Sequence, residues 1–270
     1  GPFAVKKNEV TPGSIIEKID GTDIKAGEDY NALLDGKAGK NIRLTIKNAK
    51  GKRFDLTIKA ISQGAQQELL YKRWVDRNRA IVDSVSHGRI AYVHVKAMNS
   101  ESFRTVYSEL LSEKNRTKDA VIVDERHNGG GWLHDDLCTL LSGKQYQEFV
   151  PHGKVVGRDP FNKWVKPSCV LVCEDDYSNG HGFPWVYKEL GIGKLIGAPV
   201  AGTMTAVWWE TLMDRSLVFG IPQVGCRDMR GTFGENTTLQ PDIEVYNSPE
   251  DYITGHDTQL IRAVEEMMKK

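Results

Sequence analysis

Two stretches of uninterrupted apolar residues, at 120–123 and 169–173, constrain the fold of this chain most strongly. Both are far shorter than the roughly 20 apolar residues that cross a bilayer, so no membrane span is expected. A short strand that is apolar on both faces belongs in a sheet that helices cover on both sides. With a third predicted strand at residues 90–94, these stretches predict a sheet of the α/β class.

Helices are predicted between and after these strands. The predicted helices cover residues 100–111, 132–141, 178–190 and 257–268. The last of them places Leu260, Ile261 and Val264 at three-to-four spacing, which indicates that one face of this helix packs on the core. Strand and helix therefore alternate through most of the chain.

The first sixty residues have a different, β-rich pattern. Residues 41–47 alternate between apolar and polar side chains, and residues 53–59 repeat the alternation after a turn, which predicts an antiparallel hairpin. A strand is predicted at 14–19 and a short helix at 29–34. Small and polar residues at 62–67 then interrupt the pattern. They predict two domains, residues 1–61 and residues 62–270.

Composition excludes some classes of partner. The 36 basic and 36 acidic residues leave no net charge, which disfavours binding to nucleic acid or to an anionic membrane. The four cysteines are too few for a disulfide framework and are not spaced as paired zinc ligands, so we expect them to be small buried residues. The acidic run at 174–176 is expected to be a solvated turn. No metal and no other cofactor is expected.

Polar residues and glycines follow two of the apolar strands, at 123–132 and 172–184. In α/β sheets, ligands bind beyond the carboxyl ends of the strands, so both junctions are expected to line one crevice. The three consecutive glycines, 129–131, let backbone N–H groups approach a bound group closely, which suits an anion or an oxyanion. The alternative is a flexible loop. No Gly-Lys-Ser/Thr follows, so a nucleotide-phosphate loop is disfavoured.

Ser178 stands where a helix is predicted to begin after a strand, with the N–H of Asn179 beside it. A serine presented on such a turn has the placement of an activated nucleophile. From the local sequence alone, a serine that only caps the helix is the favoured interpretation.

Four segments in this order, 90–95, 121–132, 173–184 and 235–245, resemble the S41 family of serine peptidases, and within it the tricorn-type branch. The resemblance covers residues 65–270. It implies a ClpP/crotonase-like catalytic core of mixed α/β (α+β) class. It also implies hydrolysis of peptide bonds through an acyl-enzyme, with a peptide or an unfolded polypeptide as substrate.

Residues 11–24 resemble a stretch of bacterial PDZ domains, the module that this family carries before its catalytic core. The resemblance implies a small PDZ-like, β-rich domain whose N-terminal part is missing from the chain. By analogy with PDZ-bearing members of the family, a periplasmic or other extracytoplasmic location is favoured over a cytoplasmic one.

The resemblance assigns roles to four residues. Ser178 matches the nucleophile, and the N–H groups of Asn179 and Gly130 match the oxyanion hole. Glu235, six residues before Pro241, matches the carboxylate that supports the catalytic base.

The base itself is not matched. Thr203 occupies the position of the lysine base of the tail-specific branch, and the histidine base of the tricorn branch would precede Gly1. The tricorn pattern Ser-Asp-Gly-Asp is replaced here by Ser-Asn-Gly-His at 178–181. His181 and His127 are the candidate substitutes for the base, although either can be a surface or hydrogen-bonding residue.

Two further questions stay open. Trp208 and Trp209 are expected to be buried in the core, with a place in a peptide-binding cleft as the alternative. The alternative functions are a peptide-binding pseudo-peptidase without catalysis and an acyl-thioester enzyme of the crotonase type, which the PDZ-like segment disfavours. Assembly into a homo-oligomer is left open.

Overall fold

The computed structural model describes residues 1–6 and 9–269, which form two compact units, Gly1–Asp76 and Arg77–Lys270. The division falls inside the long helix α1 (Gln63–Val85). Residues 63–67, expected to be a boundary segment, are therefore helical. The Gln, Ala and Glu residues in and after this segment have high helix propensity. They can therefore form a helix even where no wide apolar face is present.

The first unit is built on a four-stranded sheet with the order β2-β1-β3-β4. Its elements are η1 (Pro2–Lys6), β1 (Ile15–Ile19), β2 (Thr22–Asp23), η2 (Tyr30–Leu33), β3 (Asn41–Lys47) and β4 (Arg53–Lys59). Strands β3 and β4 pair antiparallel along their whole length, which confirms the predicted hairpin. The apolar side chains of one face, including Ile42, Leu44 and Ile46, form the core of this unit.

The second unit is built on a five-stranded sheet with the order β13-β10-β9-β6-β5. The strands are β5 (Ile90–His94), β6 (Ala120–Asp124), β9 (Ser168–Val172), β10 (Lys194–Gly197) and β13 (Ile243–Glu244). All neighbours in this sheet pair in parallel. Every residue of β5, β6 and β9 is buried. The prediction of α/β class from the apolar runs is confirmed.

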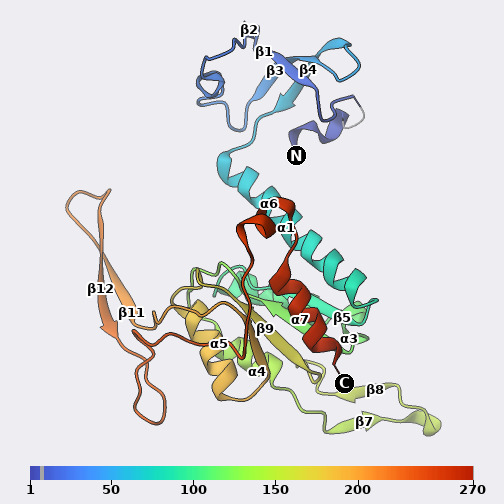
Figure 1. The fold of residues 1–270 in the computed structure, drawn as a ribbon, viewed down its shortest axis with the longest axis vertical. Coiled ribbons are helices and arrows are strands. Elements are labelled where there is room, and N and C mark those ends of the chain that lie inside the picture. Colours follow the sequence, from blue (N-terminus) through green and yellow to red (C-terminus); the bar gives the residue numbers. More distant parts are fainter. Residues whose placement is uncertain (7–8, 270) are drawn as a thin grey trace. The chain divides into compact units, whose positions relative to one another are not determined.

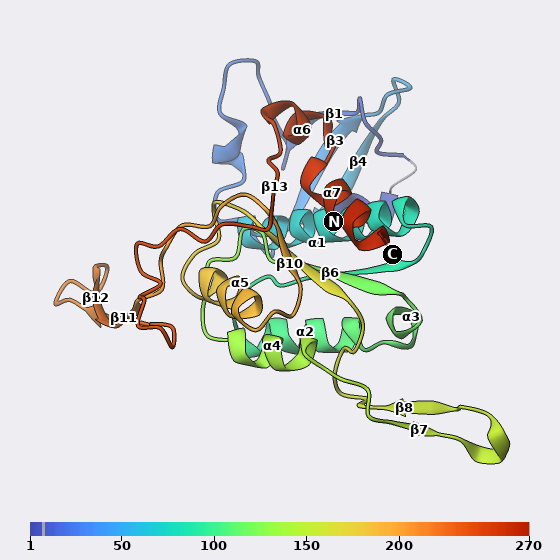
Figure 2. The ribbon, with the colours of Figure 1, turned by 60° about the horizontal axis from the view of Figure 1, so that its bottom comes forward.

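Helices cover both faces of this sheet, as Figure 2 shows. Helices α2, α4 and α5 lie on one face and α7 lies on the other. The helices of the unit after α1 are α2 (Ser100–Leu110), α3 (Glu113–Arg116), α4 (His134–Leu141), α5 (Asn179–Glu189), α6 (Pro249–Thr254) and α7 (Thr258–Met268). No helix in the described part of the chain combines the length and the apolar character needed to cross a membrane.

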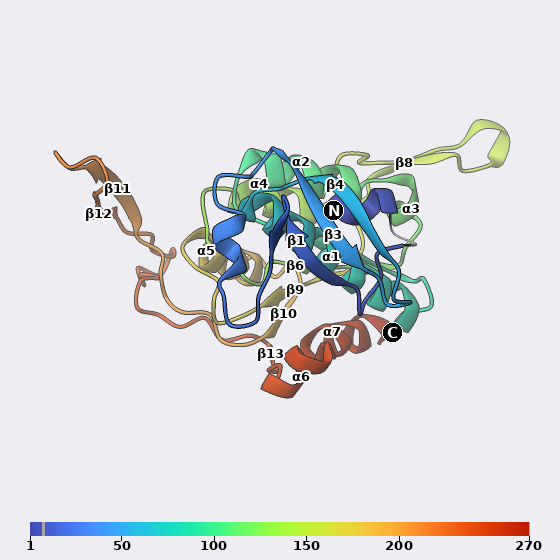
Figure 3. The same ribbon diagram turned by 90° about the horizontal axis from the view of Figure 1, so that it is seen from above.

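Two antiparallel hairpins extend on opposite sides of the second unit (Figures 1 and 3). One consists of β7 (Gln147–Phe149) and β8 (Gly157–Asp159) with η3 (Pro151–Gly153) between them, and the other of β11 (Ala206–Thr211) and β12 (Val218–Val224). The second hairpin carries Trp208 and Trp209, which are 57% and 67% exposed. The expected burial of these two residues in the core is wrong, because the hairpin stands away from the sheet.

Candidate active site

Ser178 lies on a sharp turn between strand β9 and helix α5. Its φ of +56° and ψ of −118° lie in a region that residues with a side chain rarely adopt. The backbone N–H of Ser178 donates to Thr203 Oγ1 over 3.1 Å, which helps to hold the turn. A strained strand–turn–helix junction is how α/β hydrolases expose a nucleophilic serine above the sheet.

Hydrogen bonds of Asp176 and Asn128 stabilise this turn. Asp176 Oδ2 accepts the N–H of Cys173 over 2.8 Å, and its Oδ1 accepts the N–H of Asn128 over 3.2 Å. The N–H of Tyr177 donates to the Asn128 carbonyl over 2.9 Å. Burial outweighs these hydrogen bonds and raises the pKa of Asp176 to about 8. The loop after β6 and the junction after β9 are thus tied to each other.

The glycine loop after β6 packs directly against Ser178. A Cβ placed on Gly130, whose φ is +95°, would lie 2.6 Å from Ser178 Cβ and 2.7 Å from the Tyr177 carbonyl oxygen. A Cβ on Gly131 would collide with the Met98 carbonyl. Glycine is therefore required at both positions, since any side chain would push the loop away from the serine. The structure brings the two predicted junctions together.

The N–H groups beside Ser178 differ in their partners. The Gly130 N–H donates to Asn128 Oδ1 over 2.9 Å, so the donor that the resemblance assigned to the oxyanion hole is used inside its own loop. Among the described residues no acceptor is found for the Gly131 N–H or the Asn179 N–H. These two are the donors that a developing negative charge on a bound carbonyl can recruit without breaking a hydrogen bond.

A hollow of about 830 Å³ opens in front of Ser178. Gly131, Asn179, Thr203 and Glu235 lie in its wall beside the serine. Its apolar wall consists of Trp132, Trp185, Val186, Met204, Ala206, Val207, Trp209 and Pro222. No lysine or arginine is among the lining residues. Apart from the Glu235 carboxylate the wall is mainly apolar, and it therefore suits an apolar side chain, because burying aromatic and aliphatic surface is favourable.

Asn179 connects helices α4 and α5 at the edge of the hollow. Its Oδ1 accepts the backbone N–H groups of Leu133 and His134, over 2.7 and 3.1 Å. This fixes the amide so that Nδ2 faces His134 Nδ1 at 2.9 Å. His134 Nδ1 is then the acceptor, and in the neutral ring the proton is on Nε2. Sequence reasoning missed His134, although its position three residues after Gly131 could have drawn attention to it.

Glu235 is held as an anion. Its Oε2 accepts the backbone N–H groups of Met204 and Thr205, over 2.9 and 2.7 Å. Hydrogen bonds from Thr205, more than any other cause, lower the pKa of the Glu235 carboxyl. The structure places this carboxylate in the wall of the same hollow as Ser178.

The two histidines considered as substitute bases, His127 and His181, do not line the hollow in front of Ser178. His181 is 1% exposed, neither of its ring nitrogens has a hydrogen-bond partner, and burial lowers its pKa. His127 Nδ1 lies 3.0 Å from Asp175 Oδ2. Within the described residues no hydrogen bond to the Ser178 hydroxyl is found.

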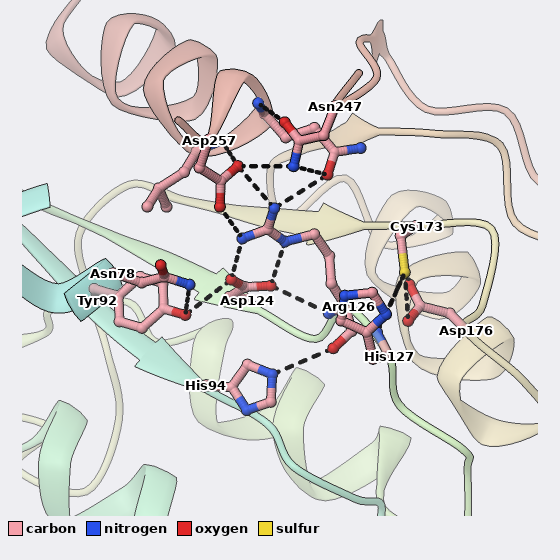
Figure 4. Close-up of polar contacts among 12 residues, drawn as sticks. Asn78, Tyr92, His94, Asp124, Arg126, His127, Cys173, Asp176, Asn247 and Asp257 are labelled. Carbon is pink, nitrogen blue, oxygen red and sulfur yellow. Dashed lines mark hydrogen bonds and ion pairs between the residues drawn. The ribbon is translucent and has the colours of Figure 1, made fainter. Parts of the chain in front are cut away.

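Asp124 and Arg126 of the glycine-loop motif form a buried network (Figure 4), whereas the buried Glu125 between them has no hydrogen-bond partner in the described chain. Arg126 binds both carboxylate oxygens of Asp124, over 2.9 and 2.7 Å, and both oxygens of Asp257, over 2.9 and 3.0 Å. The Tyr92 hydroxyl donates to Asp124 over 2.8 Å. Burial disfavours the Asp124 anion, but the guanidinium of Arg126 outweighs it and lowers the pKa of this carboxyl. Asp124 and Arg126 thus fasten the loop to the start of α7.

Comparison with known proteins gives two family matches. The family described as peptidase family S41 matches residues 89–245, and the tricorn protease PDZ domain matches residues 1–63. The S41 match includes Ser178, Glu235, the glycine loop and most of the hollow.

Individual relatives point the same way. The chain is 28% identical over 259 residues to the tricorn protease of Thermoplasma acidophilum, covering 96% of this chain and 24% of that protein. It is 29% identical over 207 residues to a tricorn protease homolog of Saccharolobus solfataricus, covering 75% of this chain and 19% of that protein. The crystal structure of the tricorn protease superposes with a TM-score of 0.81 at 28% identity, over 95% of this chain and 25% of that one. The chain thus spans about a quarter or less of the length of these relatives.

Proposed function

The chain belongs to peptidase family S41, and we propose that it is the catalytic part of a serine peptidase in which Ser178 attacks the carbonyl carbon of a peptide bond. The observation that carries the proposal is the strained Ser178 turn, packed against the glycine loop at the mouth of an apolar hollow. We further propose that residues 1–61 are a PDZ-like domain and that the catalytic core follows.

The proposed reaction is acyl transfer. Ser178 Oγ bonds to the carbonyl carbon, and the carbonyl oxygen gains negative charge as its double bond opens. The N–H of Asn179 and that of Gly131 stabilise this charge, and the Gly130 N–H can join them only by leaving Asn128 Oδ1. The amine leaves with a proton, and water then releases the acyl group from the serine.

A serine hydroxyl needs a base to accept its proton. In the described chain the ring nitrogens of His127, His134 and His181 are not hydrogen-bonded to Ser178. We therefore propose that the base comes from a segment outside this chain, in keeping with the small share of the relatives that the chain spans. Glu235, anionic and in the wall of the hollow, is the carboxylate that would support it.

The proposed substrates are peptides or unfolded polypeptides that place an apolar side chain in the hollow. Trp132, Trp185 and Trp209 supply most of the aromatic surface there. The Asn179 side chain at the edge of the hollow is neutral. Its amide oxygen and nitrogen already form hydrogen bonds to Leu133 and His134, so it does not recruit a basic side chain. Affinity is then expected to rise with the buried apolar area of the peptide side chain.

A fluorophosphonate probe tests this proposal. The probe is applied to the chain alone and with added imidazole, which supplies a base in solution, and the adduct is located by mass spectrometry. We expect slow labelling at Ser178 that imidazole accelerates and that Ser178→Ala abolishes. Labelling that persists in Ser178→Ala would refute the assignment. Peptide binding without any labelling, with or without imidazole, would support the pseudo-peptidase instead.

A further inference from the structure

A second cluster of chemically active side chains lies beside the serine turn but outside the hollow. It consists of His127, Cys173 and Asp175, each of which offers one ligand atom, and these three atoms lie within 4.8 Å of one another. His127 begins the glycine loop after β6, and Cys173 and Asp175 belong to the junction after β9. We propose that these three residues bind a divalent cation of the zinc class. The proposal does not depend on the proposed peptidase function.

The separations between the ligand atoms suit a tetrahedral ion. His127 Nδ1 lies 3.0 Å from Asp175 Oδ2 and 3.8 Å from Cys173 Sγ. Around zinc, with bonds of about 2.0–2.3 Å, neighbouring tetrahedral ligands are separated by about 3.3–3.6 Å. The third pair, Cys173 Sγ and the Asp175 carboxylate, lies within 4.8 Å, so the side chains would have to move closer together around a bound ion. Figure 4 shows the His127 ring directed at the Cys173 sulfur.

The chemistry of the donor set selects the ion. A thiolate, an imidazole nitrogen and one carboxylate oxygen are the ligands that zinc and similar borderline-soft cations prefer. Magnesium and calcium bind oxygen ligands and would not choose a sulfur atom. The cluster is thus a site for zinc, cobalt or cadmium and not for a hard cation.

Burial and the neighbouring Asp176 raise the pKa of the Cys173 thiol, so the cation and one backbone hydrogen bond would have to stabilise the thiolate. The backbone N–H of His127 donates to Cys173 Sγ over 3.2 Å, and hydrogen bonds to a ligating sulfur stabilise its negative charge. The thiol S–H donates to Asp176 Oδ1 over 3.6 Å. When the cation bonds to sulfur, the S–H bond breaks and this proton leaves to solvent.

Access comes from the solvent side of the cluster. The side chains of His127 and Asp175 are 49% and 67% exposed, whereas Cys173 is 2% exposed. The cation would have the buried sulfur on one side and water at the remaining position. It would also join the loop that carries Gly130 to the junction that carries Ser178.

Cobalt titration of the full, metal-stripped chain tests the site. We expect one equivalent of Co²⁺ to bind with a thiolate-to-cobalt charge-transfer band, and Zn²⁺ to displace it. Cys173→Ser should remove the band, whereas Cys226→Ser, which changes another cysteine outside the cluster, should keep it. Asp175→Asn should weaken Zn²⁺ binding about 100-fold, given the 10–100-fold effects seen when even an indirect partner of a ligand is lost. Glu174→Gln, in the same acidic run, should have no effect.

Three outcomes would overturn the proposal. They are a charge-transfer band that survives in folded Cys173→Ser, no Zn²⁺ binding by the original chain, and Zn²⁺ binding that is unchanged in Asp175→Asn. Because Cys173 is buried, its variant can fail to fold, so His127→Asn provides an independent test. His127 has a φ of +67°, and asparagine is among the residues that tolerate this backbone conformation. The His127→Asn variant should lose Zn²⁺ affinity about as much as Asp175→Asn does.

Discussion

The loops that follow strands β6 and β9 lie side by side and differ in how their polar groups are used. After β6, Asp124 and Arg126 form a closed network with Tyr92 and Asp257. After β9, Ser178 adopts a strained conformation and the Asn179 N–H has no acceptor in the described chain. The Asp124–Arg126 network uses its charged groups fully, whereas the Asn179 N–H beside Ser178, like the Gly131 N–H of the glycine loop, has no acceptor in the described chain.

This difference separates two roles within one sequence motif. Arg126, held by Asp124, anchors the start of α7, and the glycines of the motif shape the surface against which Ser178 lies. Changes to Asp124 or Arg126 should therefore appear in stability, and changes to the glycines that contact Ser178 should appear in reactivity.

Arg126→Met is expected to have the largest effect. It leaves the carboxylates of Asp124 and Asp257 buried without their partner, and breaking a buried ion pair in this way costs about 3–5 kcal/mol of unfolding free energy. Urea unfolding measures the loss. Arg89→Met, which breaks the exposed pair with Asp119, is the control and should change stability little. Equal losses in both variants would show that the buried network adds no more stability than an exposed ion pair.

Gly130→Ala should come next, with an effect on reactivity. Its Cβ would lie 2.6 Å from Ser178 Cβ, so the loop must move away from the serine. We expect the rate of fluorophosphonate labelling to fall about 10²–10³-fold, as when a donor to the oxyanion is lost. Gly129→Ala is the matched control, since a Cβ there meets nothing within 4 Å and its φ is not in the left-handed region. Equal labelling rates in Gly130→Ala and Gly129→Ala would show that the close packing of Gly130 against Ser178 does not affect reactivity.

His181→Leu should change the pH dependence of stability. Burial lowers the pKa of folded His181, so between its folded and unfolded pKa values the unfolded chain binds more protons. Stability from this group is thus present above about pH 6.5 and is lost as the pH falls below it, by at most about 1.4 kcal/mol per pH unit. Urea unfolding at pH 7.5 and pH 5.5 should show a smaller acid-side loss in the variant. An unchanged loss would mean that other groups cause it.

Trp209→Ala should have the smallest effect, confined to the hollow. Trp209 lines the hollow, whereas its neighbour Trp208 does not. Removing Trp209 should weaken binding of a peptide aldehyde with an aromatic side chain about tenfold, while a small fluorophosphonate still labels Ser178. Trp208→Ala should bind the aldehyde as the original chain does. Similar weakening in both variants would indicate a general change in hairpin β11–β12 and no specific contact.

Much of the sheet could be predicted because its strands are apolar without interruption. The predicted strand at residues 90–94 coincides with β5, and the apolar stretch 120–123 lies within β6, since a strand buried on both faces carries such a run. Helix α1 was missed because its many polar residues resemble those of a linker. Helix-forming propensity at these positions was the better guide.

The site could be predicted only in part. The order of motifs identified Ser178 and the glycine loop, and the structure brings them into contact. The wall of the hollow could not be predicted, because Trp132, Trp185 and Trp209 come from three distant segments. The engagement of the Gly130 N–H by Asn128 depends on a loop conformation that spacing alone does not define.

Hairpin β11–β12 pairs with no other strand among the described residues, yet it contributes Val207, Trp209 and Pro222 to the hollow. Two strands without further support are only marginally stable, whereas Ser178 follows a strand at the centre of a rigid sheet. In the proposed peptidase, the side chains that would select the peptide and the serine that would attack it therefore lie on parts of different support. Substitutions in hairpin β11–β12 could thus change which peptides are accepted without altering the Ser178 turn.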